Sequence, residues 1–240
     1  MKKRLDQMVV ERGLADSREK AQALIMAGAV MLNGQKAAKS GQSVADDAHI
    51  EVTARPQYVG RGGLKLERAL DHFGIDPASF TCLDVGSSTG GFTDCLLQRG
   101  ASRVYAVDAG TGQLDWKLRN DPRVVVHENV NARYLDTAVI PEPIDFACFD
   151  VSFISVTMIL SAVVPLLKPT APMVILVKPQ FEVGRADVGK GGIVRDPALH
   201  ESACKKVADA VGGLGFSADI IESPVLGAEG NREFLLYARR

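Results

Sequence analysis

The sequence predicts an α/β protein in which a doubly wound parallel sheet follows a small α+β module. From residue 80 onward, short apolar runs alternate with helical segments, as in strands buried between helices on both faces of a sheet. The first 55 residues instead combine two short helical patterns with hairpin signals. A length of 240 residues suits one large and one small domain. We expect a small domain at 1–55, a linker at 56–63 and the sheet domain at 64–240.

The composition is that of a soluble globular chain, with 46% hydrophobic and 24% charged residues. Residues 1–55 carry nine Lys and Arg against seven Asp and Glu, and the remainder nineteen against twenty-two, a skew too mild to indicate nucleic acid by itself. The four cysteines are scattered without CxxC spacing, which favours reduced, buried thiols in a cytosolic protein. No apolar run approaches the roughly 18 residues of a membrane span, and we expect no secretion signal at MKKRLDQMVVERG.

The small module opens with two predicted helices. In RLDQMVVERG the apolar residues recur at helical spacing, and Gly13 can end the helix. ADSREKAQALIMAG begins with two possible N-caps, Asp16 and Ser17, and ends at Gly28. AVMLNGQ then contains an Asn-Gly hairpin signal, and AHIEVTA alternates as a strand. The pattern indicates a helix pair followed by a small sheet.

The stretch RLDQMVVERGLADSREKAQALIMAGAVMLNG resembles the S4 domain, an RNA-binding module. The resemblance covers most of residues 3–55 and implies that basic side chains contact structured RNA through phosphates and shape. By composition alone, the same charges would be solvated faces of amphipathic helices. The candidate RNA-binding residues of this module are Arg4, Arg12, Arg18, Lys20 and Lys36.

A glycine-rich segment, TARPQYVGRGG, joins the two parts and is typical of a linker and a turn. Arg61 within it is a further candidate for RNA binding. The next helix is predicted in LKLERALDHFG, with Lys65 near its start. A cation is slightly disfavoured at a helix N-terminus, so Lys65 is a candidate functional residue, with an ordinary exposed lysine as the alternative.

The first strand of the large domain runs into a glycine-rich turn, LDVGSSTGGFTD, which can bring backbone amides close to a ligand. Ser88 stands where the dinucleotide pattern GxGxxG has its second glycine, which disfavours a diphosphate. Asp84 suits a cationic amine, and both departures favour S-adenosylmethionine as cofactor. The candidate cofactor-binding residues of this stretch are Asp84, Gly86, Ser87, Ser88, Thr89, Gly90, Gly91 and Phe92.

Three further residues are candidates for the cofactor because of their places at strand ends. Asp108 ends the second strand, where a carboxylate can accept hydrogen bonds from ribose hydroxyls. Helix capping is the alternative for Asp108 and for Asp84. Asn129 and Asn131 follow the third strand, where adenine is often held in this fold, although asparagines in turns also have purely local reasons.

Two charged residues directly follow apolar strands. Asp150 comes after FACF, and Lys178 comes after MVILV, where Pro179 stops the strand. Ligands bind outside the carboxyl ends of such strands, so we expect Asp150 and Lys178 to meet beside the glycine loop, with Asp150 also a candidate cofactor contact. A lysine there could orient or deprotonate a weakly acidic hydroxyl. The alternative is an ion pair that only closes the sheet edge.

After Lys178 comes EVGRADVGKGGIVRDP, a long segment rich in glycine and charge. Such loops are often functional lids, and Arg185, Lys190 and Arg195 could clamp RNA phosphates. A mobile surface loop without contacts is the equal alternative.

Glu233, which opens the last predicted strand, completes a resemblance. Lys65, Asp150, Lys178 and Glu233 resemble the Lys-Asp-Lys-Glu tetrad of the FtsJ/RrmJ-like RNA 2'-O-methyltransferases. The S4-like module followed by RGGLKL, DVGSSTGGFTD, FDVSFIS, VKPQFE and GNREF resembles the TlyA family of hemolysin-named rRNA 2'-O-methyltransferases over nearly the whole chain. The resemblance implies methyl transfer from S-adenosylmethionine to a ribose 2'-hydroxyl of ribosomal RNA, with cytidine the expected nucleoside. It also implies ribosomal RNA or subunits as partner, no metal, and a cytoplasmic site of action.

Three other functions stay open from the residues alone. A non-catalytic RNA-binding or assembly factor is opposed by the filled tetrad. A membrane-active haemolysin is opposed by the lack of a signal peptide, a span or a strongly basic amphipathic stripe. A nicotinamide-dependent enzyme is opposed by Ser88 and by the S4-like module.

Overall fold

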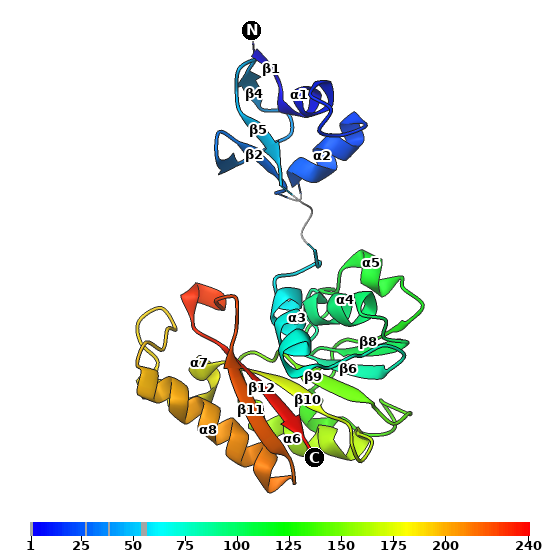
Figure 1. The fold of residues 1–240 in the computed structure, drawn as a ribbon, viewed down its shortest axis with the longest axis vertical. Coiled ribbons are helices and arrows are strands. Elements are labelled where there is room, and N and C mark those ends of the chain that lie inside the picture. Colours follow the sequence, from blue (N-terminus) through cyan, green and yellow to red (C-terminus); the bar gives the residue numbers. More distant parts are fainter. Residues whose placement is uncertain (1, 27, 38, 54–56) are drawn as a thin grey trace. The chain divides into compact units, whose positions relative to one another are not determined.

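The computed structural model describes residues 2–26, 28–37, 39–53 and 57–240, so Pro56 of the expected linker lies outside the described residues. The chain divides into two compact units, Met1–Gln57 and Tyr58–Arg240 (Figure 1).

The first unit contains the two predicted helices, a two-stranded sheet and a three-stranded sheet. Its elements are β1 (Lys2–Arg4), α1 (Leu5–Glu11), α2 (Arg18–Met26), β2 (Val30–Leu32), β3 (Gln35–Lys36), β4 (Ser43–Ala45) and β5 (Ile50–Val52). Strands β2 and β3 form the predicted hairpin, with Asn33 and Gly34 both at positive φ in its turn. Buried Leu5, Val9 and Ile25 pack the helices against these sheets. Strand β1 pairs with β4 although its sequence is basic, so hydrophobic pattern could not indicate it.

The second unit is built on a seven-stranded sheet in the order β11-β12-β10-β9-β6-β7-β8. Its strands are β6 (Thr81–Val85), β7 (Arg103–Val107), β8 (Val124–His127), β9 (Phe146–Phe149), β10 (Met173–Val177), β11 (Ser217–Glu222) and β12 (Phe234–Arg239). Strands β6 to β10 run parallel, as predicted. The prediction of a parallel sheet needs one correction, because β12 runs antiparallel to both β10 and β11. The connection 223–233 is too short for the helical crossover that a parallel neighbour requires.

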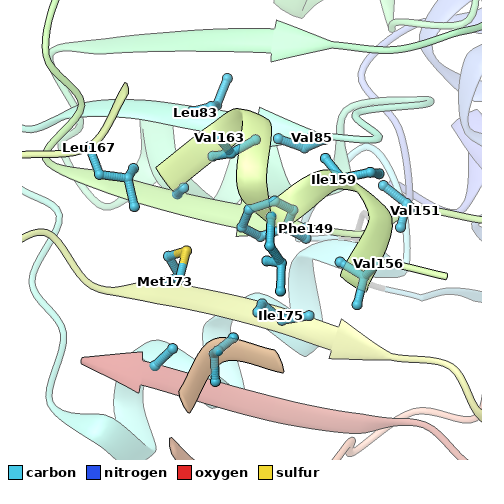
Figure 2. Packing of buried hydrophobic residues seen from close by; sticks show 14 of the residues in the cluster. Leu83, Val85, Phe149, Val151, Val156, Ile159, Val163, Leu167, Met173 and Ile175 are labelled. Carbon is cyan, nitrogen blue, oxygen red and sulfur yellow. The ribbon is translucent and has the colours of Figure 1, made fainter. Parts of the chain in front are cut away.

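Helices cover both faces of the sheet (Figure 1). One face carries α3 (Gly62–Phe73) and α4 (Gly91–Gln98), and the other carries α6 (Thr157–Val163) and α8 (Pro197–Gly213). Figure 2 shows Ile159 and Val163 of α6 beside Phe149 of β9. The unit also contains the short α-helices α5 (Trp116–Arg119) and α7 (Pro179–Glu182) and the 3-10 helices η1 (Ala132–Tyr134), η2 (Val164–Leu166), η3 (Arg185–Asp187) and η4 (Ala228–Gly230).

Each of the five residues of strand β10 is buried. Its neighbours β9 and β12 supply backbone pairing on both sides, which is why a continuous apolar run is stable there. The next residue, Lys178, lies outside the ladder, and Pro179 begins α7. The end of β10 therefore marks the boundary between the core and the candidate site.

Candidate active site

Three parallel strands, β6, β9 and β10, bring their carboxyl ends to one edge of the sheet. Val85 of β6 pairs with Phe149 of β9, which in turn pairs with Ile175 of β10. The amide of Asp150 donates a 2.9 Å hydrogen bond to the carbonyl oxygen of Val85. The register therefore places the glycine turn after β6 directly beside Asp150.

Asp150 and Lys178 form an ion pair at this edge. Lys178 Nζ lies 2.6 Å from Asp150 Oδ1 and donates a 2.8 Å hydrogen bond to Ser152 Oγ. Both charged side chains are largely shielded from solvent. Helix α3 approaches the same carboxylate, because a Cβ at Gly62 would lie 3.5 Å from Asp150 Oδ2.

Lys65 and Glu233 form a second, more buried ion pair. Lys65 Nζ on α3 donates to Glu233 Oε2 at 2.5 Å, and the side chains are 10% and 2% exposed. Glu233 directly precedes β12, whose first residue, Phe234, pairs with Val177 at the end of β10. Lys178 follows Val177 and Glu233 precedes Phe234, so both lie just beyond the pair that ends the β10–β12 ladder. The four tetrad residues meet at one end of the sheet as two ion pairs.

Two adjoining cavities lie at this edge, and the larger of the two, about 330 Å³, lies beside the Asp150–Lys178 pair. Asp108 stands in its wall, and its two carboxylate oxygens accept hydrogen bonds from the amides of Ser88 at 2.8 Å and Gly110 at 2.7 Å. The residues that line it are Val85, Gly86, Ser88, Val107, Asp108, Ala109, Gly110, Gln113, Val130, Asn131, Ala132, Asp150, Val151, Ser152, Phe153, Ile154 and Ile159. One acidic wall and several apolar walls suit a nucleoside.

A smaller cavity of about 100 Å³ shares Gly86, Ser88 and Asp150 with the larger one. The turn from β6 and the start of α3 enclose it, and its lining residues are Gly60, Arg61, Gly62, Gly86, Ser87, Ser88, Thr89, Gly91, Phe92 and Asp150. Gly86 adopts φ 86°, and a Cβ there would lie 2.7 Å from the carbonyl oxygen of Asp150. Only glycine allows this approach of the turn to the ion pair.

The comparison with protein families matches residues 58–240 to the FtsJ-like methyltransferases and residues 3–50 to the S4 domain. This chain belongs to the FtsJ-like methyltransferase family. It is 46% identical over 239 residues to the 16S/23S rRNA (cytidine-2'-O)-methyltransferase TlyA of Mycobacterium tuberculosis (strain ATCC 25618 / H37Rv). The matched residues cover 98% of this chain and 89% of that protein. Hemolysin A of Brachyspira hyodysenteriae is 44% identical over 236 residues, 98% of each chain.

Solved structures agree with this assignment. A structure from Streptococcus thermophilus, whose name contains the word hemolysin, covers 100% of this chain and 88% of its own, with 42% identity and a TM-score of 0.77. A SAM-dependent methyltransferase from Aquifex aeolicus is 21% identical over 75% of this chain and 93% of its own, with a TM-score of 0.51. That second likeness shows that the FtsJ-like unit has the fold of S-adenosylmethionine-dependent methyltransferases.

Asp84 is a correction to the expected cofactor contacts of this FtsJ-like methyltransferase. Its side chain is fully buried on the α4 face of the sheet, accepts a 2.6 Å hydrogen bond from Thr93 Oγ1 and lines neither cavity. Burial raises the pKa of Asp84 to about 7, and the hydrogen bonds from Thr93 oppose that rise. The carboxylate therefore ties the turn to α4 instead of facing a ligand amine. Gly90 packs against α5, since a Cβ at Gly90, whose φ is 96°, would overlap Leu118.

The two asparagines have different places. Asn131 lines the larger cavity, and its Oδ1 accepts a 3.1 Å hydrogen bond from the amide of Arg133, which caps η1. Asn129 is exposed, lines neither cavity and adopts φ 56° in the turn after β8, where its amide donates to the carbonyl oxygen of Gly110. Asn129 has a local role in this turn, and its contact with adenine stays a prediction.

Phe153 belongs to the cavity wall and was missed from the sequence. Its side chain is 93% exposed, its φ is 67°, and its ring centroid lies 5.5 Å from that of Phe181. A bulky residue with positive φ is strained, and such strain clusters at functional sites. The motif FDVSFIS contained this phenylalanine, but no sequence pattern indicates its backbone conformation or exposure.

The expected lid after α7 is folded against the turn before β12. The amide of Gly189 donates to the carbonyl oxygen of Ile193 at 3.0 Å. The side chain of buried Asn231 accepts from the amide of Val194 at 3.0 Å and donates to the carbonyl oxygen of Gly192 at 2.9 Å. Arg185, Lys190 and Arg195 are exposed on this loop. The reading of a loop without contacts is wrong, and Asn231 is a functional candidate that the sequence did not indicate.

The candidate RNA-binding residues of the S4 domain are partly engaged within it. Arg4 and Arg18 both contact buried Asp6, at 2.9 and 3.0 Å, and hydrogen bonding from Arg4 is the main cause of the lowered pKa of Asp6. The half-exposed guanidinium groups still face solvent. The remaining placements are Arg12 on the carbonyl oxygens of Asp46 and Ala48, Lys20 on Asp16, and Lys36 and Arg61 exposed.

Within the part of the chain that the structure describes, no helix is long and apolar enough to cross a membrane. Across the same described residues, no group of three or more His, Cys, Asp or Glu side chains could hold a metal ion. The four cysteines are free and buried, as predicted.

Proposed function

We propose that this protein transfers a methyl group from S-adenosylmethionine to a ribose 2'-hydroxyl of ribosomal RNA, with cytidine as the modified nucleoside. The Asp150–Lys178 ion pair beside the larger cavity carries the proposal, because it puts a positioned amine next to a site suited to a nucleoside. The names of the relatives with 46% identity support the substrate class.

The residues present fit S-adenosylmethionine. A cavity of about 330 Å³ is within the range of small-molecule sites. The Asp108 carboxylate would accept hydrogen bonds from the ribose hydroxyls, and apolar Val130 and Ile159 would contact the adenine. The smaller cavity beside Gly60 and Gly62 would receive the methionine portion, whose ammonium suits the nearby Asp150 carboxylate.

When bound, S-adenosylmethionine supplies a methyl group on a cationic sulfur, which makes the leaving group good without further activation. Lys178 has three N–H donors, and among the described residues Asp150 and Ser152 engage two of them. The third would contact the 2'-oxygen and hold it toward the cofactor cavity. Asp150 keeps the ammonium in place, and the proton of the hydroxyl would pass to the Asp150 carboxylate as the 2'-oxygen takes the methyl group. Most of the acceleration would come from positioning the two substrates.

Lys65 and Glu233 would complete the charge network on the side of β12 and help to bind the target nucleotide. Exposed Phe153, at the rim of the cavity, offers a ring face for the target base. The S4 domain and the loop with Arg185, Lys190 and Arg195 would bind RNA phosphates. The proposed substrate is ribosomal RNA or a ribosomal subunit, and the proposed site of reaction is the cytoplasm.

Methyl transfer from labelled S-adenosylmethionine to separated ribosomal subunits and to free ribosomal RNA, followed by mapping of ribose methylation, tests the proposal. We expect a labelled ribose with the wild type and a loss of at least about 100-fold in kcat with Lys178→Ala. Cofactor affinity should change little, because Lys178 is not part of either cavity wall. An absence of transfer to every ribosomal substrate, with cofactor binding intact, would instead favour a non-catalytic assembly factor.

A further inference from the structure

A buried carboxylate outside the tetrad, that of Glu182, contacts the loop 150–156. This loop joins β9 to α6, supplies one wall of the larger cavity and carries both partners of Lys178, Asp150 and Ser152. We propose that Glu182 is a positioning residue that holds this loop in the conformation that methyl transfer requires. The inference rests on the proposed function and adds a residue to its site.

Glu182 holds the far end of the loop through two hydrogen bonds. Ser155 Oγ donates to Glu182 Oε2 at 2.5 Å, and the amide of Val156 donates to Glu182 Oε1 at 2.8 Å. The Glu182 side chain is only 3% exposed, so neither bond competes freely with water. By accepting hydrogen bonds from a backbone amide and a hydroxyl, the Glu182 carboxylate fixes the backbone at Val156 and the side chain of Ser155.

The near end of the loop is held by the same short helix. Lys178, the N-cap residue of α7, contacts Asp150 and Ser152, and Glu182 at the end of α7 contacts Ser155 and Val156. One turn of helix therefore clamps both ends of the loop. A shift of the Glu182 end would move the partners of Lys178 relative to its amine.

Lys206 on α8 makes this burial of a carboxylate tolerable. Its Nζ lies 3.0 Å from Glu182 Oε2 and donates a 2.7 Å hydrogen bond to the carbonyl oxygen of the same residue. A buried charge without a partner is strongly destabilising, whereas a hydrogen-bonded pair is not. The lysine anchors α7 to α8, so the clamp is attached to a long helix of the core.

The loop needs such a clamp because its backbone is strained. Phe153, at its centre, has φ 67° and presents an exposed ring. Strained conformations persist only where the surroundings over-determine them. The contacts of Lys178 on one side and Glu182 on the other are restraints of that kind.

Glu182→Gln, which keeps the size of the side chain, and Ser155→Ala, which keeps the Glu182–Lys206 pair, are the test variants. We expect Glu182→Gln to lower kcat by about 10- to 100-fold, since displacements near 1 Å have effects of that size. The KM for RNA should change much less. Ser155→Ala should act in the same direction, and the double variant should lose less than the product of the two single losses. Lys205→Ala, which removes an exposed pair with Asp209 on α8, is the matched control and should keep wild-type activity.

Hydrogen exchange of the ligand-free protein gives a readout that does not depend on activity. Glu182→Gln should speed exchange of the amides of residues 151–156, while those of β9 and β10 stay protected. Wild-type kcat and wild-type exchange in both variants would overturn the proposal, as would a lowered Tm with unchanged kcat well below Tm. If Glu182→Gln does not fold, Ser155→Ala alone decides by the same two measurements. A wild type that methylates no RNA contradicts the proposed function, whereas the exchange result still judges the clamp.

Discussion

Removing the Glu233 carboxylate should destabilise the methyltransferase unit far more than removing both members of its ion pair. Lys65 Nζ lies 2.5 Å from Glu233 Oε2, and the side chains are 10% and 2% exposed. In Glu233→Leu the Lys65 ammonium stays buried without its partner, which should cost about 3–5 kcal/mol. A unit of this size loses roughly 2–4 °C in Tm per kcal/mol, so Tm should fall by about 6–20 °C.

The double variant Lys65→Met, Glu233→Leu removes both charges and both desolvation costs. Pairs replaced by apolar residues of similar volume are often neutral or stabilising, so most of the lost stability should return. Methyl transfer should not return, because the proposed charge network is absent. Urea unfolding followed by circular dichroism measures the first result, and methyl transfer to ribosomal RNA measures the second.

An exposed pair close in sequence serves as the control. Arg232 and Glu222 lie 2.6 Å apart with both side chains about half-exposed, so Glu222→Gln should cost less than about 1 kcal/mol. A double variant as unstable as Glu233→Leu would refute the argument from buried charge. A double variant with wild-type methyl transfer would refute the functional role of the Lys65–Glu233 pair.

Two other predictions concern the carboxylates of Asp84 and Asp108. Burial raises the pKa of Asp84 to about 7 from an ordinary value of 3.8. Between about pH 4 and pH 7 the folded state therefore binds more protons than the unfolded state, so wild-type stability falls as pH rises through that window. Asp84→Asn, which can still accept from Thr93, should therefore gain stability over the wild type at pH 8 and little at pH 4; a stability difference independent of pH would contradict this. Asp108→Ala should weaken S-adenosylmethionine binding by about 10- to 100-fold in calorimetry, because it removes a charged acceptor for the ribose. Unchanged affinity would place the nucleoside elsewhere.

The sequence predicted those parts of the site whose position depends only on the order of the strands. Lys178 and Asp150 each follow an apolar run, and parallel strands end at a common edge, so their meeting required no detailed knowledge of packing. The turn with Gly86 was predicted to bring the backbone close to a ligand, and the structure also shows Gly86 close to the backbone of Asp150. The pattern of apolar runs therefore predicts which residues lie at this edge of the sheet.

Side-chain direction and backbone conformation could not be predicted in this way. Asp84 precedes the glycine turn, but strand alternation points it toward α4 and Thr93 instead of the cavity. Phe153 depends on a positive φ, and Asn231 bonds to a backbone amide 37 positions away and to a backbone carbonyl oxygen 39 positions away in the sequence. Helix α8 and the edge strand β11 were not predicted. Strand β11 has exposed residues at positions 217, 219, 220 and 222, so its exposed and less exposed residues do not alternate with a clear two-residue period.

The place of β12 in the sheet has a consequence for synthesis on the ribosome. This strand follows all the others in sequence, yet it lies between β10 and β11. While residues 234–239 are still inside the ribosome, β10 has an unpaired edge and Glu233 cannot reach Lys65. The S4 domain can fold well before that moment, whereas the methyltransferase unit must wait. A nascent chain therefore acquires its RNA-binding part first and completes its tetrad last.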